Sequence, residues 1–587
     1  MQTLRKSLIL LAVVLAILAP SAAASGVQPA HAGHGMVASQ HELASAAGVE
    51  IMRAGGNAVD AAVATGFALA VVHPQAGNLG GGGFMLVRFA DGKTRFVDFR
   101  EKAPAAATRD MYLDAKGNVV PDASIIGYRA ISVPGSVAGL AYAQKKFGKL
   151  PLARVMAPAM RLAREGFPLA YEDARDFRDP ELAKFTASRR IFQRDGRYYQ
   201  PGQVFKQPEL ARTLERIAAN PEDFYRGAMA REVAAAVQKG GGLITEQDLA
   251  SYQVKEREPV RGTYRGYEIV SAPPPSSGGI ALIELLNILE GYDLGKLGNR
   301  SAESMHLTIE AFRRAYFDRA EFLGDADFAA IPVALLIDKR YAAAWRESLD
   351  PDHASHSAGL HRPSKVFGDL DRYAELHPQP LAGREPEYTT HYSVVDGAGN
   401  GVAVTTTLND LFGSRVTAEG LGFLLNDEMD DFTAKAGVPN LYGLLQGEAN
   451  TIAPGKRPLS AMMPTMVLKD GKLLLVLGAP GGGKIISTVA NILMGVVDYG
   501  LDVQEAVNAP RFHHQWMPDE VWYERTGFSP DTLRLLQSMG HRVREGYPER
   551  GVRRPYWSDG ECIAIDAKTG ERLGASDPRS NGKAVGY

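Results

Sequence analysis

The stretch EYTTHYSVVDGAGNGVAVTTTL, residues 387–408, decides how this chain folds. Residues 390–395 alternate apolar and polar side chains, which is the period-2 pattern of a half-buried β-strand. Residues 396–400 hold two glycines, an aspartate and an asparagine, so they predict a turn. The strand pattern then continues over residues 401–408. The sequence therefore predicts a β-hairpin here, with a threonine pair at its entrance.

The segment before this hairpin has a different texture. Residues 350–388 are polar and contain four histidines and five prolines, which predicts an exposed linker. A cut in front of Thr389 would make this threonine the first residue of a new chain. Its α-amino group, with a pKa of about 8, could then accept the proton of its own hydroxyl, as in N-terminal threonine nucleophiles. The alternative is that Thr389 serves only as a strand former.

Strand and helix patterns recur along the rest of the chain. Asp91-Gly92 and Asp470-Gly471 each predict a hairpin turn between two apolar strands. Helical patterns dominate residues 131–239, and apolar helices are predicted near 279–289 and 485–499. These elements predict an α+β fold with two sheets layered between helices. The length of 587 residues, taken alone, favours several domains.

The N-terminal sequence predicts where the mature protein is located. Within residues 1–24, the basic residues Arg5 and Lys6 precede an apolar run at 8–19, as in a secretory signal peptide. The run is shorter than the roughly 20 residues needed to span a bilayer, so cleavage is expected instead of anchoring. The mature protein is expected to be periplasmic or secreted, with no membrane association. Residues 28–35 are expected to form a loose tail.

Charge and cysteine content exclude several classes of protein. The 65 basic and 67 acidic residues give a net charge of −2, so nothing favours bulk binding of nucleic acid. Cys562 is the only cysteine, which excludes an intrachain disulfide and a zinc site built on several cysteines. His513 and His514 are adjacent and diverge on a helix or a strand. No metal site is therefore predicted.

A glycine-rich loop, GAPGGGK at 478–484, lies between a predicted strand and a predicted helix. Its spacing matches a phosphate-binding loop, although Ile485 occupies the position of the Ser or Thr that would hold magnesium. A nucleotide-binding protein is therefore one alternative. The loop could also be a plain strand-to-helix turn. In a third interpretation, its amides stabilise an oxyanion during acyl transfer.

The region around Thr389 resembles the processing site of γ-glutamyltranspeptidases, also called glutathione hydrolases. The likeness covers nearly the whole chain, with these motifs in order: GGNAVDAA at 55–62, DFREKAP at 98–104, NDEMDDF at 426–432, KRPLS at 456–460, APRFHH at 509–514 and ASDPR at 575–579. The resemblance implies an N-terminal nucleophile hydrolase with a four-layer αββα sandwich. One precursor would cleave itself between Tyr388 and Thr389 into two associated subunits, at 25–388 and 389–587.

The same resemblance implies roles for ten residues. Thr389 would be the nucleophile, and Thr407 would orient its α-amino group. Gly481 and Gly482 would supply oxyanion-hole amides. The γ-glutamyl group would be bound by Arg100 and Ser460 at its α-carboxylate, by Asn409, Glu428 and Asp431 at its ammonium, and by Tyr442 as a cover. The charge pattern suits a zwitterion, with the cation separated from the acids. No metal or organic cofactor is implied.

The implied activity is acyl transfer through an ester on Thr389. The γ-glutamyl group of glutathione or a related amide would pass to water, or to an amino acid or peptide. Ala461 departs from the family, which commonly has a second serine here, so one hydrogen bond to the carboxylate would be lost. This departure keeps open an acylase of the same fold that acts on β-lactam or other side-chain amides. A non-catalytic exported scaffold that stays uncut is a further alternative.

Overall fold

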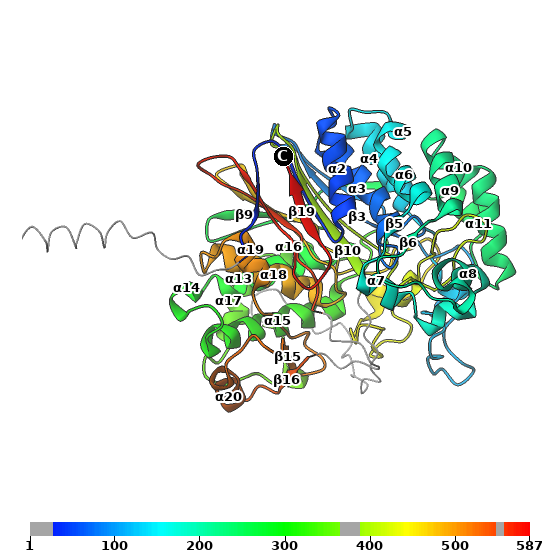
Figure 1. Ribbon diagram of the computed structural model, residues 1–587. Helices are drawn as coiled ribbons and strands as arrows, with labels where there is room; N and C mark the ends of the chain where they lie inside the picture. Colours follow the sequence, from blue (N-terminus) through cyan, green and yellow to red (C-terminus); the bar gives the residue numbers. More distant parts are fainter. Residues whose placement is uncertain (1–26, 364–387, 547–556) are drawn as a thin grey trace, which may run out of the picture.

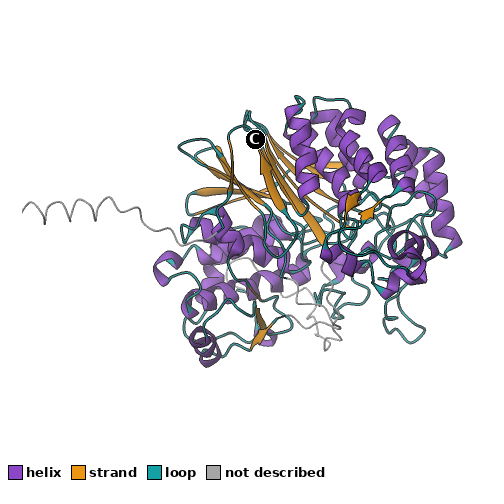
Figure 2. Cartoon of the chain, in the orientation of Figure 1, coloured by secondary structure: helices purple, strands orange, loops and turns teal. Residues whose placement is uncertain are grey.

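The computed structural model describes residues 27–363, 388–546 and 557–587. Two seven-stranded sheets face each other in the centre, and helices cover both outer sides (Figures 1 and 2). This arrangement is the predicted four-layer αββα sandwich. Both halves of the chain contribute strands to both sheets, so the expectation of several domains is wrong. The predicted signal peptide at 1–24 lies outside the described residues.

The first sheet is built around the hairpin that the sequence predicts. β10 (Thr389–Val395) and β11 (Gly401–Thr407) pair antiparallel, with Thr389 directly opposite Thr407. The strand order is β19-β2-β10-β11-β3-β4-β7. The other strands are β2 (Met36–Ser39), β3 (Gly82–Arg88), β4 (Thr94–Asp98), β7 (Lys255–Arg257) and β19 (Lys583–Gly586).

The second sheet has the order β1-β18-β17-β13-β12-β9-β8. Its strands are β1 (Ala30–Ala32), β8 (Val260–Tyr264), β9 (Tyr267–Ser271), β12 (Thr465–Lys469), β13 (Lys472–Leu477), β17 (Cys562–Ile565) and β18 (Arg572–Ala575). The expectation of a loose tail at 28–35 is wrong. Ala30–Ala32 pairs with β18, and the His34 amide donates to the Tyr587 carbonyl at 2.8 Å. Backbone pairing with a sheet edge therefore orders this small, polar segment.

Helices from different parts of the chain form the two outer layers (Figure 1). The first sheet is covered by α2 (Glu42–Arg53), α3 (Ala58–Val72) and α4 (Ser136–Phe147), with α6 (Ala157–Glu165), α9 (Pro208–Ala219) and α11 (Ala228–Lys239) further out. The other layer contains α13 (Gly278–Leu289), α15 (Ala302–Phe322), α17 (Lys339–Glu347), α18 (Lys484–Val497) and α19 (Val503–Asn508). Every residue of α3 is buried, which fits its apolar surface on all sides. No helix among the described residues is long and apolar enough to cross a bilayer.

β10 divides its side chains between two cores. Tyr392 and Val394 pack with the helices outside the first sheet, whereas Val395 belongs to the core between the sheets. Side chains alternate across a strand, so Thr389 points to the same side as Val395. Tyr388, one residue earlier, therefore has the opposite orientation. This alternation turns the Thr389 hydroxyl toward the interior between the sheets.

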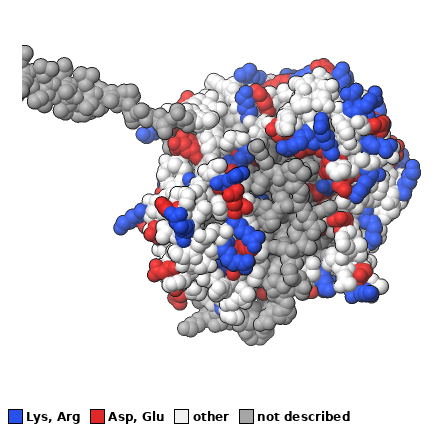
Figure 3. All heavy atoms as spheres, turned by 60° about the horizontal axis from the view of Figure 1, so that its bottom comes forward, with Lys and Arg blue, Asp and Glu red and all other residues white. Residues whose placement is uncertain are grey.

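Most of the described part of the predicted linker, residues 350–363, is exposed or half-buried as expected, and only Ser357 and Arg362 are buried. Arg362 is buried and forms ion pairs with Asp318 and Glu321 of α15. Buried carboxylates need cationic partners, and this requirement holds the segment against the helix. Residues 364–387 lie outside the described part of the chain. On the face in Figure 3, Lys and Arg side chains are interspersed with Asp and Glu, so this face has no broad basic surface.

Candidate active site

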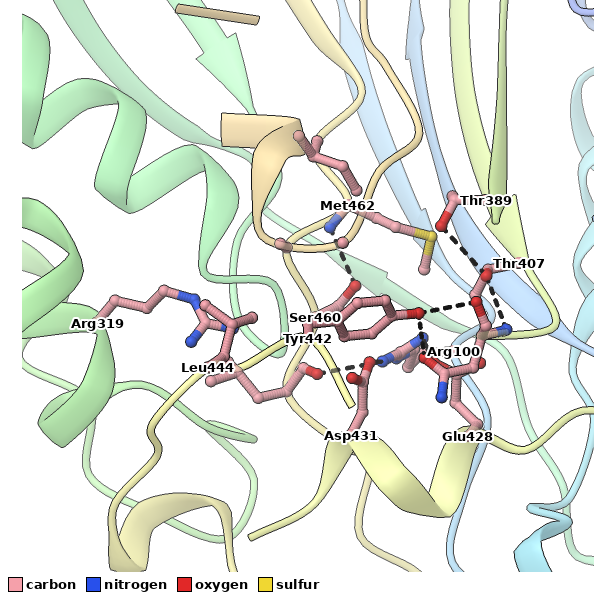
Figure 4. Close-up of a pocket in the computed structure, with 15 residues that line it drawn as sticks. Arg100, Arg319, Thr389, Thr407, Glu428, Asp431, Tyr442, Leu444, Ser460 and Met462 are labelled. Carbon is pink, nitrogen blue, oxygen red and sulfur yellow. Dashed lines mark hydrogen bonds and ion pairs between the residues drawn. The ribbon is translucent and has the colours of Figure 1, made fainter. Parts of the chain in front are cut away.

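The hydroxyl groups at the entrance of the hairpin form a short hydrogen-bonded chain (Figure 4). The Thr389 hydroxyl donates to Oγ1 of Thr407 at 3.3 Å, and the Thr407 hydroxyl donates to the Tyr388 carbonyl at 3.2 Å. The backbone amide of Asn409 donates to Thr407 Oγ1 at 2.8 Å. Thr407 therefore uses its one donor and accepts two hydrogen bonds, which fixes its orientation. The peptide bond between Tyr388 and Thr389 thus has a polarising donor beside it.

A pocket opens next to these hydroxyl groups. Its lining includes nine of the ten residues named from the sequence: Arg100, Thr389, Thr407, Asn409, Glu428, Asp431, Tyr442, Ser460 and Gly482. Gly481 is the tenth and does not line it. The free volume is only about 20 Å³, close to that of a single water molecule. Residues more than 300 positions apart in the chain therefore meet at one closely packed point.

Arg100 does not stand apart from the acidic residues, and the expected charge separation is wrong. Its Nη1 forms an ion pair with Glu428, and its Nη2 pairs with Asp431 at 2.5 Å. Nη2 also donates to the Leu459 carbonyl at 3.1 Å, and Nε donates to the Pro458 carbonyl at 3.3 Å. The Arg100 side chain is fully buried, and a buried charge is stable only when it is paired. The arginine and its two acids are therefore one mutually neutralising group.

A third carboxyl group adjoins this cluster. Glu101 Oε2 lies 3.5 Å from Nη1 of Arg100, and the Glu101 side chain is fully buried. Burial raises the pKa of Glu101 to about 7, although the charge of Arg100 opposes the shift. Burial also raises the pKa of Glu428 well above its ordinary value. One guanidinium cannot balance three carboxylates, so the cluster holds a proton at neutral pH.

Tyr442 and Asn409 form the cover of the pocket. The Tyr442 hydroxyl lies 2.8 Å from the Asn409 carbonyl and 2.7 Å from its Oδ1. The Asn409 amide nitrogen donates to the Asp427 carbonyl at 3.1 Å. Asn409 also adopts a left-handed backbone conformation with φ of +82°. These contacts hold Asn409 between the end of β11 and the segment that begins at Asp427.

Two glycine segments bring backbone close to the site. A Cβ atom on Gly81 would lie 2.0 Å from the Thr407 carbonyl, and one on Gly83 would lie 2.3 Å from the Thr405 carbonyl. The glycines at 80–83 therefore allow close backbone packing. In the second segment, Gly481 and Gly482 have φ of +122° and +51°, and α18 begins just beyond them. Consecutive glycines in such conformations form a concave set of amides, which suits an anion.

The structure adds pocket residues that the sequence did not single out. They include Arg319, Leu444, Leu459 and Met462. Glu101 immediately follows Arg100, so its position could have been noticed. Arg319 lies on the buried helix α15, far along the chain from the other polar residues of the site. No local pattern in the sequence marks it.

Among the residues that the structure describes, one buried group has the ligand types for a metal ion, namely His306, Glu310 and His541. His306 Nδ1 lies 2.8 Å from Nε2 of His541, and its Nε2 lies 2.8 Å from the Asp350 carbonyl. Glu310 forms ion pairs with two arginines, Arg313 and Arg314. Two guanidinium charges beside the carboxylate disfavour a cation. The geometry is that of a hydrogen-bonded network.

An αββα sandwich in which a nucleophilic residue begins a central strand is the arrangement of the N-terminal nucleophile hydrolases, and Thr389 has this position here. A profile of the γ-glutamyltranspeptidase family matches residues 44–587. The chain is 47% identical to a glutathione hydrolase proenzyme of a Pseudomonas species, over 100% of both chains. It is 48% identical to the glutathione hydrolase proenzyme of Escherichia coli, over 94% of this chain and 91% of the relative.

The structure of a cephalosporin acylase from Bacillus halodurans is also similar. It has a TM-score of 0.81 and 28% identity, over 97% of this chain and 98% of the acylase. The protein belongs to the γ-glutamyltranspeptidase family. It is therefore an enzyme that hydrolyses and transfers γ-glutamyl groups.

Proposed function

We propose that Thr389 cleaves the chain in front of itself and then becomes the catalytic nucleophile. The observation that carries the proposal is the contact of Thr407 with both the Thr389 hydroxyl and the Tyr388 carbonyl. Thr389 Oγ1 attacks the Tyr388 carbonyl carbon, and the hydroxyl of Thr407 stabilises the developing oxyanion. The C–N bond breaks, and the proton lost by the Thr389 hydroxyl passes to the amide nitrogen, which becomes an amine. Water then hydrolyses the resulting ester and leaves a carboxylate on Tyr388.

The new α-amino group acts as the base for the second reaction. It accepts the proton of the Thr389 hydroxyl as this oxygen attacks a γ-glutamyl amide. The amides of Gly481 and Gly482 stabilise the tetrahedral oxyanion, and the amine half of the substrate leaves with a proton. A γ-glutamyl ester remains on Thr389. Water, or the amino group of an amino acid or peptide, then takes the acyl group and restores the hydroxyl.

Glutathione is the proposed donor substrate. The γ-glutamyl group carries a carboxylate and an ammonium on its α-carbon, and the pocket offers both charges. The acids Glu428 and Asp431 suit the ammonium, and Ser460 suits the carboxylate. The relatives at 47% and 48% identity are glutathione hydrolase proenzymes, whereas the similar cephalosporin acylase is only 28% identical. This difference favours the γ-glutamyl substrate over the acylase alternative that Ala461 kept open.

Two further proposals concern location and assembly. The run at 8–19 directs export, and cleavage after about Ala24 leaves a protein outside the cytoplasm. Self-cleavage divides the remainder into subunits 25–388 and 389–587, which stay together by packing because Cys562 is the only cysteine. The strand order of both sheets supports this assembly, since each sheet mixes strands from the two subunits.

The experiment that tests this function is intact mass measurement with N-terminal sequencing of the purified protein. We expect fragments of about 39 and 21 kDa, with the smaller one beginning Thr-Thr-His-Tyr. Thr389→Ala should remain uncut and should not release p-nitroaniline from γ-glutamyl-p-nitroanilide. The matched control is Thr390→Val, because the Thr390 hydroxyl is buried without a hydrogen-bond partner. The proposal is wrong if Thr389→Ala matures, or if Thr390→Val fails to mature.

A substrate panel separates the two acyl-transfer alternatives. The wild-type enzyme should hydrolyse glutathione and γ-glutamyl-p-nitroanilide, and it should turn over glutaryl and β-lactam side-chain amides poorly. Faster turnover of the side-chain amides would instead establish the acylase. Release of cysteinylglycine from glutathione, followed by mass spectrometry, identifies the bond that is cut.

A further inference from the structure

A buried glutamine, Gln515, contacts the residue that covers the active-site pocket. It directly follows the APRFHH motif at 509–514, to which the proposed function assigns no role. Only 3% of the residue is exposed, and it does not line the pocket itself. Its amide nitrogen donates to the Tyr442 carbonyl at 3.2 Å, and its Oε1 lies 2.9 Å from Nε2 of His513. Both ends of this buried amide therefore have a partner, and the two partners belong to different segments of the chain.

The two partners fix the direction of the Gln515 amide. The Tyr442 carbonyl can only accept, so the NH2 group faces Tyr442 and Oε1 faces His513. Oε1 can also only accept, so Nε2 of His513 carries a proton. Burial lowers the pKa of His513 to about 3, although the hydrogen bond with Gln515 acts in the opposite direction, and the ring is neutral at pH 7. An ionised carboxylate or an apolar side chain at position 515 would not reproduce both hydrogen bonds.

His513 continues the connection to helix α18. It lies on β14 (Phe512–His513), and its unprotonated Nδ1 lies 2.8 Å from the Ser487 hydroxyl. The same hydroxyl lies 3.0 Å from the Lys484 carbonyl, and its single proton is directed to the closer Nδ1. Ser487 is in the first turn of α18, which begins at Lys484, directly after the glycine loop. Gln515 and His513 thus join the cover to the helix that carries this loop.

The cover and the glycine loop also contact each other directly. A Cβ on Gly482 would lie 2.6 Å from the Tyr442 ring, so ring and backbone are closely packed. The Tyr316 hydroxyl on α15 donates to the Gly483 carbonyl, and the rings of Tyr316 and His513 form a T-shaped pair with centroids 5.7 Å apart. Side chains in a close-packed interior do not shift independently of their neighbours. Displacement of Tyr442 is therefore coupled to displacement of the loop.

We propose that Gln515 is a positioning residue that holds the cover Tyr442 and the glycine loop in one fixed arrangement. The inference rests on the proposed γ-glutamyl function, because it assigns this arrangement to acyl transfer by Thr389. Tyr442 encloses the γ-glutamyl group, so a displaced cover weakens substrate binding. Gly481 and Gly482 stabilise the oxyanion, so a displaced loop slows the acyl step. Loss of the Gln515 amide therefore impairs binding and catalysis together.

The test compares Gln515→Met with Gln504→Met in the matured enzyme. Gln515→Met keeps the approximate volume of the side chain and removes both hydrogen bonds. We expect it to raise KM for γ-glutamyl-p-nitroanilide about 3- to 10-fold and to lower kcat about 3- to 10-fold. Gln504 is the matched control, because it is 5% exposed, its amide donates to the Ser576 carbonyl at 3.0 Å and it does not line the pocket. Gln504→Met should lower thermal stability without changing either constant.

Two further measurements locate the effect at the cover. Hydrogen exchange followed by mass spectrometry should show faster exchange of residues 438–446 in Gln515→Met and no change in the hairpin at 389–407. Gln515→Glu keeps the acceptor for His513 but places an ionised oxygen against the Tyr442 carbonyl, so it should show the same kinetic loss at alkaline pH. Its activity relative to the wild type should recover as the pH falls, because a protonated carboxyl group can donate to that carbonyl. The two subunits on a denaturing gel report that each variant has matured.

Several results would overturn the inference. If only one of the two constants changes, or if exchange at 438–446 is unaltered, Gln515 does not couple the cover to the loop. If Gln504→Met causes the same kinetic loss, or if neither Gln515 variant matures, Gln515 contributes to folding in general. A wild-type enzyme that fails on γ-glutamyl-p-nitroanilide would refute the proposed function instead. An active wild type with an unimpaired Gln515→Met would refute only the coupling.

Discussion

The hydroxyl groups of Thr389 and Thr407 lie 3.3 Å apart, directly across two paired strands. The register of the hairpin sets this distance, because a shift of one residue would turn one hydroxyl to the opposite face of the sheet. Thr407 at the same time touches the carbonyl of Tyr388. The Thr407 hydroxyl is therefore positioned to contact the Tyr388–Thr389 peptide bond before cleavage and to orient Thr389 after it.

Removal of the Thr407 hydroxyl should slow maturation. We expect Thr407→Val to cleave itself about 100- to 1,000-fold more slowly, which is the usual loss when a donor to a developing oxyanion is removed. A time course of the two subunits on a denaturing gel measures this rate. Thr407→Ser keeps the hydroxyl and should stay within about 10-fold of the wild type. Equal rates for the valine and serine variants would contradict the role.

A methyl group on Gly482 should block the site. Its φ is +51°, and a Cβ would lie 2.6 Å from the ring of Tyr442. We expect Gly482→Ala to lose more than about 100-fold in kcat/KM for γ-glutamyl-p-nitroanilide, because the loop must move and misplace its amides. The adjacent Gly483 is the control, since its φ is −58°, which any residue can adopt, and a Cβ there would meet the end of the Gln515 side chain instead of the Tyr442 ring. If Gly483→Ala were as damaging, a general distortion of the loop would explain both losses.

The substrate affinity should depend on pH through Glu101. Its pKa is raised from 4.5 to about 7, so the group ionises as the pH rises through 7 and adds negative charge near the substrate ammonium. We expect KM for γ-glutamyl-p-nitroanilide to fall across this range and Glu101→Gln to flatten the profile. The free energy of unfolding changes in the opposite direction and falls as the pH rises. The reason is that the folded state binds more protons than the unfolded state between pH 4.5 and 7. The contribution present at low pH is lost as the pH rises. Glu448→Gln, at an exposed position, should leave the KM profile unchanged.

Asp519 should help to hold the two subunits together. It forms an ion pair with Arg313 and a hydrogen bond with His514 Nε2 at 3.2 Å, and its Oδ2 accepts from the Ser357 amide at 2.9 Å. Burial raises the pKa of Asp519, but the His514 hydrogen bond and the Arg313 charge outweigh it and hold the pKa well below its usual range. We expect Asp519→Asn to lower the free energy of unfolding by about 2 kcal/mol at pH 7.

The same carboxylate predicts an acid dependence. A depressed pKa gives stability above the unfolded value of 3.8, and this stability is lost as the pH falls. Urea unfolding of the cleaved enzyme should therefore show a gap between wild type and Asp519→Asn that narrows below about pH 4. Asp531→Asn is the control, because its partner Arg534 is exposed and such pairs contribute little. A gap that is unchanged at pH 3 would contradict the assignment.

The order of residues 387–408 was enough to predict the hairpin, because alternation and turn residues act over a few neighbours. The same local logic identified the turn at Asp470-Gly471. Local patterns did not predict conformations that depend on contacts with distant parts of the chain. Residues 28–35 have no strand pattern of their own and are ordered by the edge strand β18. Residues 350–363 are mostly exposed, as their linker composition predicts, but Arg362 at their end is buried against the acids of α15.

The sequence by itself determined the candidate nucleophile Thr389, the identities of the charged groups and the absence of a disulfide. Only the tertiary structure decided how these charges combine. Arg100 pairs with the acids from which it was expected to stand apart, because charges brought together out of water must neutralise one another. Arg319 enters the same pocket from a buried helix, and it differs from the paired arginines because no carboxylate among the described residues forms an ion pair with it. Such burial depends on contacts between distant segments, so no short stretch of sequence can reveal it.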